Sequence, residues 1–277
     1  IDSTGLYVNG STTALAGGAS DIDGLSDAIV VDGSIGFGTG ALANDDGTAN
    51  YNIAFGPDAL NDNTSGNNNT AIGPSALRDN IAGYNNTAVG GYSMLLANDS
   101  SFYGNTALGW GTLRSNLTGG QNTASGYLAM FGGGGNANAA FNSAYGAYSL
   151  NGITTGTYNT ALGRGSSRSI TTGHYSTSVG GISLELLTTG ERNIGLGYKA
   201  GRSITTGSNN TVIGELFGSA SLSNTVLIGA GTTERLKIDS TGLYVNGSTT
   251  ALGGGATDID GLSDGYYDGG SVGLGDG

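Results

Sequence analysis

The sequence predicts an all-β fold, a parallel β-solenoid (β-roll) built from coils of about 17 residues, and three observations point to it. The segment NTAIG at 69–73 recurs in close or looser copies, such as NTAVG at 86–90 and NTALG at 105–109, from residue 52 to residue 229. Most copies follow one another at a constant interval, as shown by the glycines that close them: Gly56, Gly73, Gly90, Gly109, Gly126, Gly146, Gly163, Gly180, Gly197, Gly214 and Gly229. Glycine makes up 55 of the 277 residues without the three-residue period of collagen. Such a unit is too short for helical repeats of roughly 33 to 47 residues and suits one coil with short strands between tight corners.

The composition excludes several classes of function. The chain carries 21 acidic and 9 basic residues, a net charge of −12, with no basic cluster. This balance argues against binding to nucleic acid or to anionic membranes. No apolar run approaches the roughly 20 residues of a membrane span, so we expect no membrane insertion. The absence of cysteine excludes disulfides and thiol chemistry.

Alternation within each repeat predicts two faces of a short strand. Residues of the Ile72 column are mostly bulky and apolar, and we expect them to fill the interior of the solenoid. The Ala71 column lies on the opposite face, and its small side chains suggest the close approach of a second copy of the chain. This predicted chain-packing column consists of Ala54, Ala71, Ala88, Ala107, Ala124, Ala144 and Ala161.

An asparagine begins most repeats, and stacked coils would bring these asparagines into line. Equivalent residues in adjacent parallel strands lie about 4.8 Å apart, so their amides can pass hydrogen bonds from coil to coil. We therefore expect a structural ladder rather than a binding role. The predicted ladder consists of Asn52, Asn69, Asn86, Asn105, Asn122, Asn142, Asn159, Asn193 and Asn210.

The repeated NTAIGxxAL pattern with glycine-rich corners resembles the head repeats of YadA-like trimeric autotransporter adhesins, and it is similar to the repeat shafts of bacteriophage tail fibres. The segment ERLKIDSTGLYVNG at 234–247 is similar to segments that follow such repeats in fibres. The resemblance implies a left-handed β-roll, three chains wound about a common axis, and adhesion or host recognition. The adhesin heads usually have a shorter repeat than the unit of about 17 residues found here.

Residues that could carry chemistry are few. Asp21, Asp23 and Asp27 recur as Asp258, Asp260 and Asp264, and three carboxylates in such a short segment are weak candidates for calcium. Their glycine does not match the usual calcium-loop position, so an acidic surface turn is the preferred interpretation. His174 is the only histidine and lacks a second metal ligand or triad partner in the sequence. We expect no catalytic residues and no cofactor, and therefore no enzyme.

Two further features bear on the surface of the predicted solenoid. A column of threonines, at 70, 87, 106, 123, 160, 177 and 211, resembles the ranks of ice-binding solenoids, but the second rank of the strand is apolar. The two longest units contain LLANDSSFYG and FGGGGNANAAF, and insertions in solenoids form loops on one face. These two loops are the expected places for receptor contacts.

The segment IDSTGLYVNGSTTAL occurs at residues 1–15 and again at 238–252. It predicts a β-hairpin, with strands LKID and LYV joined at STG, that caps one solenoid and links to the next. The expected organisation is an acidic hairpin connector at 1–33, a solenoid of about 12 coils at 34–231, and a second connector with the start of another module at 232–277. Because self-similarity at a fixed offset marks a repeat, the parent protein is expected to contain tandem modules of about 237 residues.

Together these features predict a structural, fibre-forming protein of an extracellular or virion filament with an adhesive or receptor-binding role. Its partners would be further copies of itself, as a trimer and end to end, and a host or surface receptor, either a glycan or a protein. A cell-surface trimeric adhesin is the alternative within the same architecture. A polysaccharide-degrading fibre enzyme is the alternative of another class.

Overall fold

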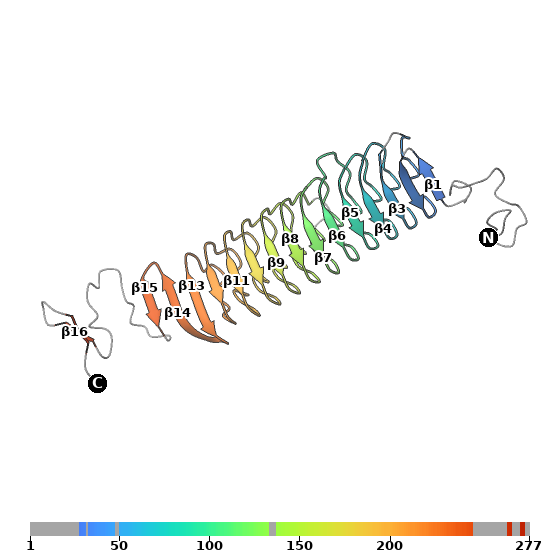
Figure 1. The fold of residues 1–277 in the computed structure, drawn as a ribbon. Helices are drawn as coiled ribbons and strands as arrows, with labels where there is room; N and C mark the ends of the chain where they lie inside the picture. Colours follow the sequence, from blue (N-terminus) through green and yellow to red (C-terminus); the bar gives the residue numbers. More distant parts are fainter. Residues whose placement is uncertain are drawn as a thin grey trace, which may run out of the picture.

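The computed structural model describes residues 28–31, 33–47, 50–132, 137–245, 265–267 and 272–274. Within them the chain is all-β and forms an elongated solenoid in which each coil contributes one short strand to a single sheet (Figure 1). Twelve parallel strands stack in sequence order, which gives about eleven turns. They are β2 (Ser34–Phe37), β3 (Ile53–Phe55), β4 (Thr70–Ile72), β5 (Thr87–Val89), β6 (Thr106–Leu108), β7 (Thr123–Ser125), β8 (Ser143–Tyr145), β9 (Thr160–Leu162), β10 (Thr177–Val179), β11 (Ile194–Leu196), β12 (Thr211–Ile213) and β13 (Val226–Ala230). The predicted parallel β-solenoid is confirmed.

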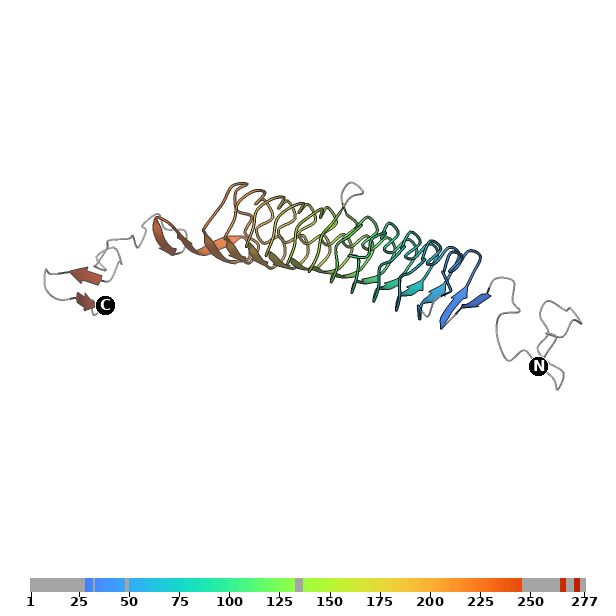
Figure 2. The same cartoon turned by 90° about the horizontal axis from the view of Figure 1, so that it is seen from above.

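The register between neighbouring strands follows the sequence repeat. Thr70 pairs with Thr87, Ala71 with Ala88 and Ile72 with Val89, so like residues stack along the solenoid. Backbone hydrogen bonds also join the coils outside the sheet, as from the Leu60 amide to the Ala76 carbonyl at 3.0 Å. Neighbouring coils are thus hydrogen-bonded both in the sheet and in the turns, and they form a regular stack over the length of the sheet (Figure 2).

The glycine that closes each repeat allows this stacking. Gly73 has a φ of 125°, which a side chain would strain, and a Cβ placed on it would come within 2.7 Å of the Gly90 carbonyl carbon in the next coil. The same close approach recurs from coil to coil. The corner glycine is thus required both for the backbone turn and for the spacing between coils.

The core of each coil is narrow and is filled by three kinds of side chain. Ala71 in the strand, and Ala76 and Leu77 in the turn that follows, are all completely buried. The largest buried side chains lie mainly in a rank four residues after the corner glycine. This rank includes Leu42, Leu60, Leu77, Met94, Leu113, Met130, Leu150 and Leu184.

The expectation for the two strand faces was wrong. All seven residues of the Ala71 column are completely buried inside the coil, and the Ile72 column faces outward. At Gly195, which occupies the alanine position of its coil, an added Cβ would lie 2.9 Å from Leu184 Cγ. The alanine column is therefore small because the leucine rank lies opposite it, and it cannot pack against another chain.

Antiparallel strands close both ends of the parallel stack. β1 (Ala28–Val31) pairs with β2 at the start, and β14 (Thr233–Asp239) and β15 (Gly242–Val245) follow β13 as a meander. The β14–β15 hairpin, with Asp239 paired to Gly242, is the hairpin predicted from LKID and LYV. The earlier copy of that segment, Ile1–Leu15, lies outside the described residues.

A short hairpin near the end of the chain repeats the pairing at the start. β16 (Gly265–Tyr267) and β17 (Val272–Leu274) are antiparallel, with Gly265 opposite Leu274. In the first hairpin Ala28 lies opposite Phe37. The two pairs are separated by the same sequence offset that separates Ile238 from Ile1. The sequence duplication is thus also a duplication of strand pairing.

Candidate interaction surfaces

The outward side of the parallel sheet is the most extensive exposed feature. Each three-residue strand buries its middle residue and turns its first and third residues outward. The third residues form an apolar rank: Phe37, Phe55, Ile72, Val89, Leu108, Tyr145, Leu162, Val179, Leu196, Ile213 and Ile228, interrupted by Ser125. Several of these side chains are more than 40% exposed, among them Ile72, Leu108 and Leu162. We call this surface the outer sheet face.

The first residues of the strands complete the outer sheet face. Threonine occupies this rank in seven of the twelve strands, and Ile35, Ile53, Ser143, Ile194 and Val226 occupy it in the other five. With twelve strands about 4.8 Å apart and residues i and i+2 nearly 7 Å apart, the face is about 50 Å long and about 10 Å wide. The apolar rank and the threonine methyl groups together form a strip of a size that is often functional when a monomer exposes it.

The predicted asparagine ladder lies inside the solenoid, next to the strands. Asn69 Oδ1 accepts hydrogen bonds from the backbone N of Asn86 at 3.0 Å and from its Nδ2 at 3.1 Å. Asn69 Nδ2 donates to the Gly83 carbonyl at 2.8 Å. All nine predicted members are almost completely buried, and Ser176 replaces asparagine in one coil. These amides are occupied by the fold and are not available to a ligand.

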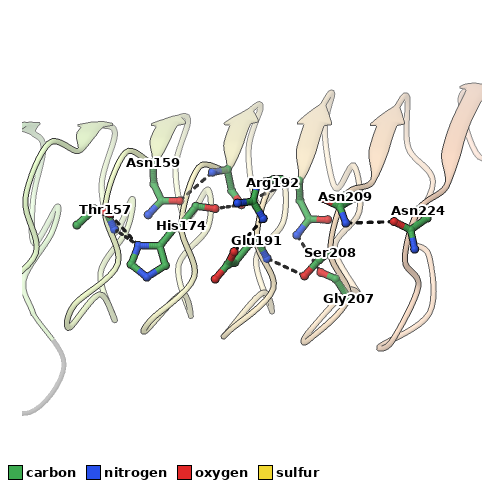
Figure 3. Close-up of polar contacts among 11 residues, drawn as sticks. Thr157, Asn159, His174, Glu191, Arg192, Gly207, Ser208, Asn209 and Asn224 are labelled. Carbon is green, nitrogen blue, oxygen red and sulfur yellow. Dashed lines mark hydrogen bonds and ion pairs between the residues drawn. The ribbon is translucent and has the colours of Figure 1, made fainter.

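His174 belongs to a row of polar residues on successive coils (Figure 3). The backbone N–H of Thr157 donates to His174 Nδ1 at 3.0 Å, and Thr157 Oγ1 lies 2.8 Å from the same nitrogen. In the following coils Ser208 Oγ accepts from the Glu191 backbone N at 3.0 Å, and Arg192 pairs with Glu191 at 3.1 Å. No hydrogen bond joins this serine to the histidine among the contacts of the described residues, so the row lacks the nucleophile–base contact of a catalytic triad.

No metal centre is found in the part of the chain that the structure describes. No group of three or more His, Asp or Glu side chains there is placed to hold a metal ion. The calcium candidates Asp21, Asp23, Asp27, Asp258, Asp260 and Asp264 all lie outside the described residues. The described segments also contain no helix that could cross a membrane.

The two longest coils accommodate their extra residues differently. In the coil that contains LLANDSSFYG, Phe102 is completely buried and belongs to the same core cluster as Ala97. The preceding residues form a tight turn in which Asp99 Oδ1 accepts from the Ser101 backbone N at 2.8 Å. Part of this insertion is thus core rather than receptor loop. In the coil that contains FGGGGNANAAF, residues 133–136 lie outside the described residues.

A row of aromatic rings runs along the corner that follows the strands, and sequence reasoning did not find it. The ring centroids of Tyr92 and Trp110 are 5.7 Å apart, those of Trp110 and Tyr127 are 5.4 Å apart, and those of Tyr127 and Tyr148 are 5.5 Å apart. The signal was present, because each ring lies one or two residues after a corner glycine. The varying offset hid it from a search for identical repeat positions.

A second aromatic row precedes the strands. Phe141, Tyr158 and Tyr175 stack with centroids 4.9 Å and 5.3 Å apart, and Arg192 lies over Tyr175.

Comparisons with protein-family models, with curated proteins and with solved structures found no match to this chain. The surfaces of the chain itself are therefore the evidence for its function.

Proposed function

We propose that this chain is a structural segment of an extracellular or virion filament, and that copies of it associate along their outer sheet faces. The apolar rank on that face is the observation that supports the proposal. Apolar side chains occupy this rank in nearly every coil, although they point outward and do not fill the core of the chain. Removing this strip from water would stabilise a complex by the hydrophobic effect.

The distribution of charge supports the same face as the contact surface. The outward positions of β3 to β13 hold no Asp, Glu, Lys or Arg. The antiparallel strand β14, in contrast, carries Glu234, Arg235, Lys237 and Asp239. Charges on a strand near a sheet end discourage further strand pairing. Association is therefore favoured between faces, side by side, and disfavoured at the β14–β15 end.

A stiff scaffold is consistent with a fibre role. Each coil is bonded to its neighbours through the sheet, the asparagine ladder and the backbone contacts of the turns. Such stacks are quasi-one-dimensional, and they present surface ranks at fixed spacing. The resemblance to adhesin heads and tail-fibre shafts suggests three copies around an axis, and an adhesive role for the surfaces that remain exposed.

Sedimentation equilibrium of the native chain tests the proposal. We expect a species with three times the 27.3 kDa chain mass. The triple variant Ile72→Lys, Leu108→Lys, Leu162→Lys places charges on the outer sheet face and should sediment as a monomer. The control variant Ile81→Lys, Leu186→Lys changes residues that are similarly exposed but off the sheet, and it should keep the native mass. A native chain that is monomeric at micromolar concentration would overturn the proposal.

A polysaccharide-cleaving role is the competing class. The described carboxylates are either scattered or engaged in ion pairs, such as Glu185 with Arg202 at 2.6 Å and Glu215 with Lys199 at 3.4 Å. No observation on the described residues favours this role. Release of sugars from polysaccharides incubated with the native chain would favour it over a purely structural filament.

A further inference from the structure

The aromatic row along the corner that follows the strands is joined by arginines. Arg114 Cζ lies 5.9 Å from the ring centroid of Tyr92 and 5.6 Å from that of Phe131, and Arg168 Cζ lies 5.4 Å from the Tyr148 centroid. We call the surface formed by Tyr92, Trp110, Tyr127, Tyr148, Arg114 and Arg168 the aromatic–arginine corner. It spans successive coils in the middle of the solenoid.

The fold does not require these rings. The residue that follows the corner glycine is Trp110 or Tyr127 here, but it is Pro57, Pro74 or Gly181 in other coils. Trp110 is 44% exposed and Tyr127 is 48% exposed although they stack on each other. Large aromatic side chains held partly in water at replaceable positions are typical of interaction surfaces.

The arginines of the corner lack the carboxylate partners that Arg78 and Arg202 have. Arg78 pairs with Asp79 at 2.6 Å, and Arg202 pairs with Glu185 at 2.6 Å. Among the described residues no ion pair is formed by Arg114 or Arg168, and the buried Nε of Arg114 has no hydrogen-bond partner. Two guanidinium groups are therefore left to bind an anion.

The charge around the corner differs from that of the whole chain. Residues 80–184 contain three arginines and one aspartate, a net charge of +2, whereas the chain as a whole carries −12. The third arginine, Arg164, is exposed and follows the corner glycine two coils after Tyr127. The acidic residues are concentrated toward the two ends of the chain, so the corner lies in a stretch where basic groups outnumber acidic ones.

We propose that the aromatic–arginine corner binds acidic polysaccharides through the carboxylate or sulfate groups on their sugars; this inference rests on the adhesive part of the proposed function. Guanidinium groups bind carboxylate and sulfate oxygens with paired, charge-assisted hydrogen bonds. Trp110 and Tyr127 stack, whereas Tyr92 and Tyr148 meet their neighbours edge to face. Aromatic edges carry positive partial charge that attracts oxygen atoms. Tyrosine hydroxyls and the tryptophan N–H add polar contacts suited to sugar hydroxyls.

Single-stranded nucleic acid is the other polyanion with this general chemistry, and the ring geometry disfavours it. Binding of bases depends on free aromatic faces on which successive bases stack. Here Trp110 and Tyr127 stack on each other with an interplanar angle of 20°, so their facing surfaces are already occupied. Arg114 and Arg168 lie over the rings of Tyr92 and Tyr148. The corner thus offers edges and cations rather than open faces.

Binding of the native full chain to immobilised polymers tests the proposal. The probes are polygalacturonate for carboxylates, dextran sulfate for sulfates, neutral dextran, and oligo-thymidylate. We expect binding to at least one acidic polysaccharide that weakens as salt rises, with none to neutral dextran. Equal binding to neutral dextran, no binding to either acidic polysaccharide, or binding to oligo-thymidylate alone would overturn the proposal.

Matched arginine variants locate the site. Arg114→Gln with Arg168→Gln should reduce affinity at least about tenfold, because charge-assisted hydrogen bonds are lost. Arg202→Gln is the control, because Arg202 lies at the same repeat position but outside the corner. An equal loss in that control would contradict the site, as would unchanged binding in the double variant. Arg114→Lys with Arg168→Lys should retain part of the binding, which separates loss of charge from loss of fold.

The outcome is separable from the proposed filament. Sedimentation of the Arg114→Gln, Arg168→Gln variant reports whether self-association survives, since neither residue belongs to the outer sheet face. A chain that associates but binds no acidic polysaccharide would refute this inference alone. A chain that binds the polymer as a monomer would refute the filament alone.

Discussion

The first and second halves of the solenoid fill the same interior corner with different chemistry. Seven residues after the corner glycine, the first half places Asn63, Asn80 and Asn116, whereas the second half places Ile153, Ile170, Leu187 and Ile204. All of these side chains are buried. The strand register and the asparagine ladder are the same in both halves. The coil is therefore determined by backbone pairing and the ladder, while the corner can be polar or apolar.

A second rank changes with the corner. The rank four residues after the glycine is occupied by large apolar residues in the first half, but it becomes Ser167, Gly201 and Gly218 in three coils of the second half. The coils of Ser167 and Gly201 carry Ile170 and Ile204 at the interior corner. An added Cβ on Gly201 would lie 2.6 Å from Leu184 Cδ2 of the preceding coil and 3.3 Å from Ile204 Cδ1, so these two side chains occupy the space that a leucine would fill. Because Leu150 and Leu184 lie in the alternate coils, interior volume is shared among neighbouring positions rather than fixed at each one.

The asparagines at the interior corner of the first half do not satisfy all of their hydrogen-bonding groups. Asn80 Nδ2 donates to Asn63 Oδ1 at 2.9 Å and to the Gly83 carbonyl at 3.2 Å. Asn80 Oδ1 is buried without a partner, because the next coil has Ala97 at this position and offers no donor. A short asparagine row that ends inside the protein thus leaves an acceptor unsatisfied.

The largest expected effect comes from the shared ladder and should be equal in both halves. Asn105→Ala removes the acceptor of Asn122 N at 2.9 Å, and Asn159→Ala removes the acceptor of Ser176 N at 3.0 Å. Each change also removes one side-chain hydrogen bond to a buried glycine carbonyl. We expect each to lower the free energy of unfolding by about 4 kcal/mol. Urea unfolding followed by circular dichroism measures this; a cost below about 1 kcal/mol in either half would contradict the shared role.

Substitutions at the interior corner should change the free energy of unfolding by different amounts in the two halves. Ile170→Ala leaves a cavity in the apolar corner and should cost about 3 kcal/mol. Asn80→Ala removes a side chain whose Oδ1 is already unpaired and should cost about 1 kcal/mol. The same urea titration compares them. Equal costs would show that the two corners do not differ energetically.

Side chains four and seven residues after the corner glycine share interior space, so substitutions at these two positions should have coupled effects on the free energy of unfolding. Leu77→Ser alone should cost about 3 kcal/mol through loss of buried apolar volume. Adding Asn80→Ile recreates the pair found at Ser167 and Ile170, and it should recover about 1 to 2 kcal/mol. A double-mutant cycle measures the coupling. Strictly additive costs would mean that the two ranks are independent.

The smallest effect concerns backbone conformation outside the core. Ile182 has a φ of 50°, an unfavourable value for a β-branched residue, at a repeat position that holds Gly111 in the first half and Gly165 in the preceding coil. Ile182→Gly should therefore stabilise the chain by less than about 1 kcal/mol. Thermal unfolding detects this as a small rise in Tm. A fall in Tm would show that the isoleucine contacts outweigh the strain.

The sequence was sufficient to predict the repeat, the strand in each coil, the ladder and the β14–β15 hairpin. It failed on which strand face is inside, because alternation defines two faces without identifying the interior. The interior bulk comes from turn residues such as Leu77, whose φ of 51° lies in the left-handed region. A strand pattern carries no information about such positions. With leucines supplied from the turn, the strand has room inside only for Ala71, and Ile72 turns outward.

Because the inner and outer strand faces were exchanged in the prediction, the predicted contact surface was also wrong. The alanine column was expected to meet another chain, but the structure places the Ile72 column on the surface. The aromatic–arginine corner was missed because its rings shift between one and two residues after the glycine. Its positions follow from three-dimensional stacking rather than from an identical place in each repeat.

Protection of the outer sheet face in solution tests the central claim most directly. The chain has no cysteine, so Ser125→Cys introduces a single thiol into the outward rank of β7, and Ser101→Cys introduces one at an exposed position off the sheet. If copies associate through this face, the thiol at 125 should react slowly with a maleimide at high protein concentration and faster on dilution. The thiol at 101 should react quickly at both concentrations. Equally fast reaction of both thiols at every concentration would contradict the account.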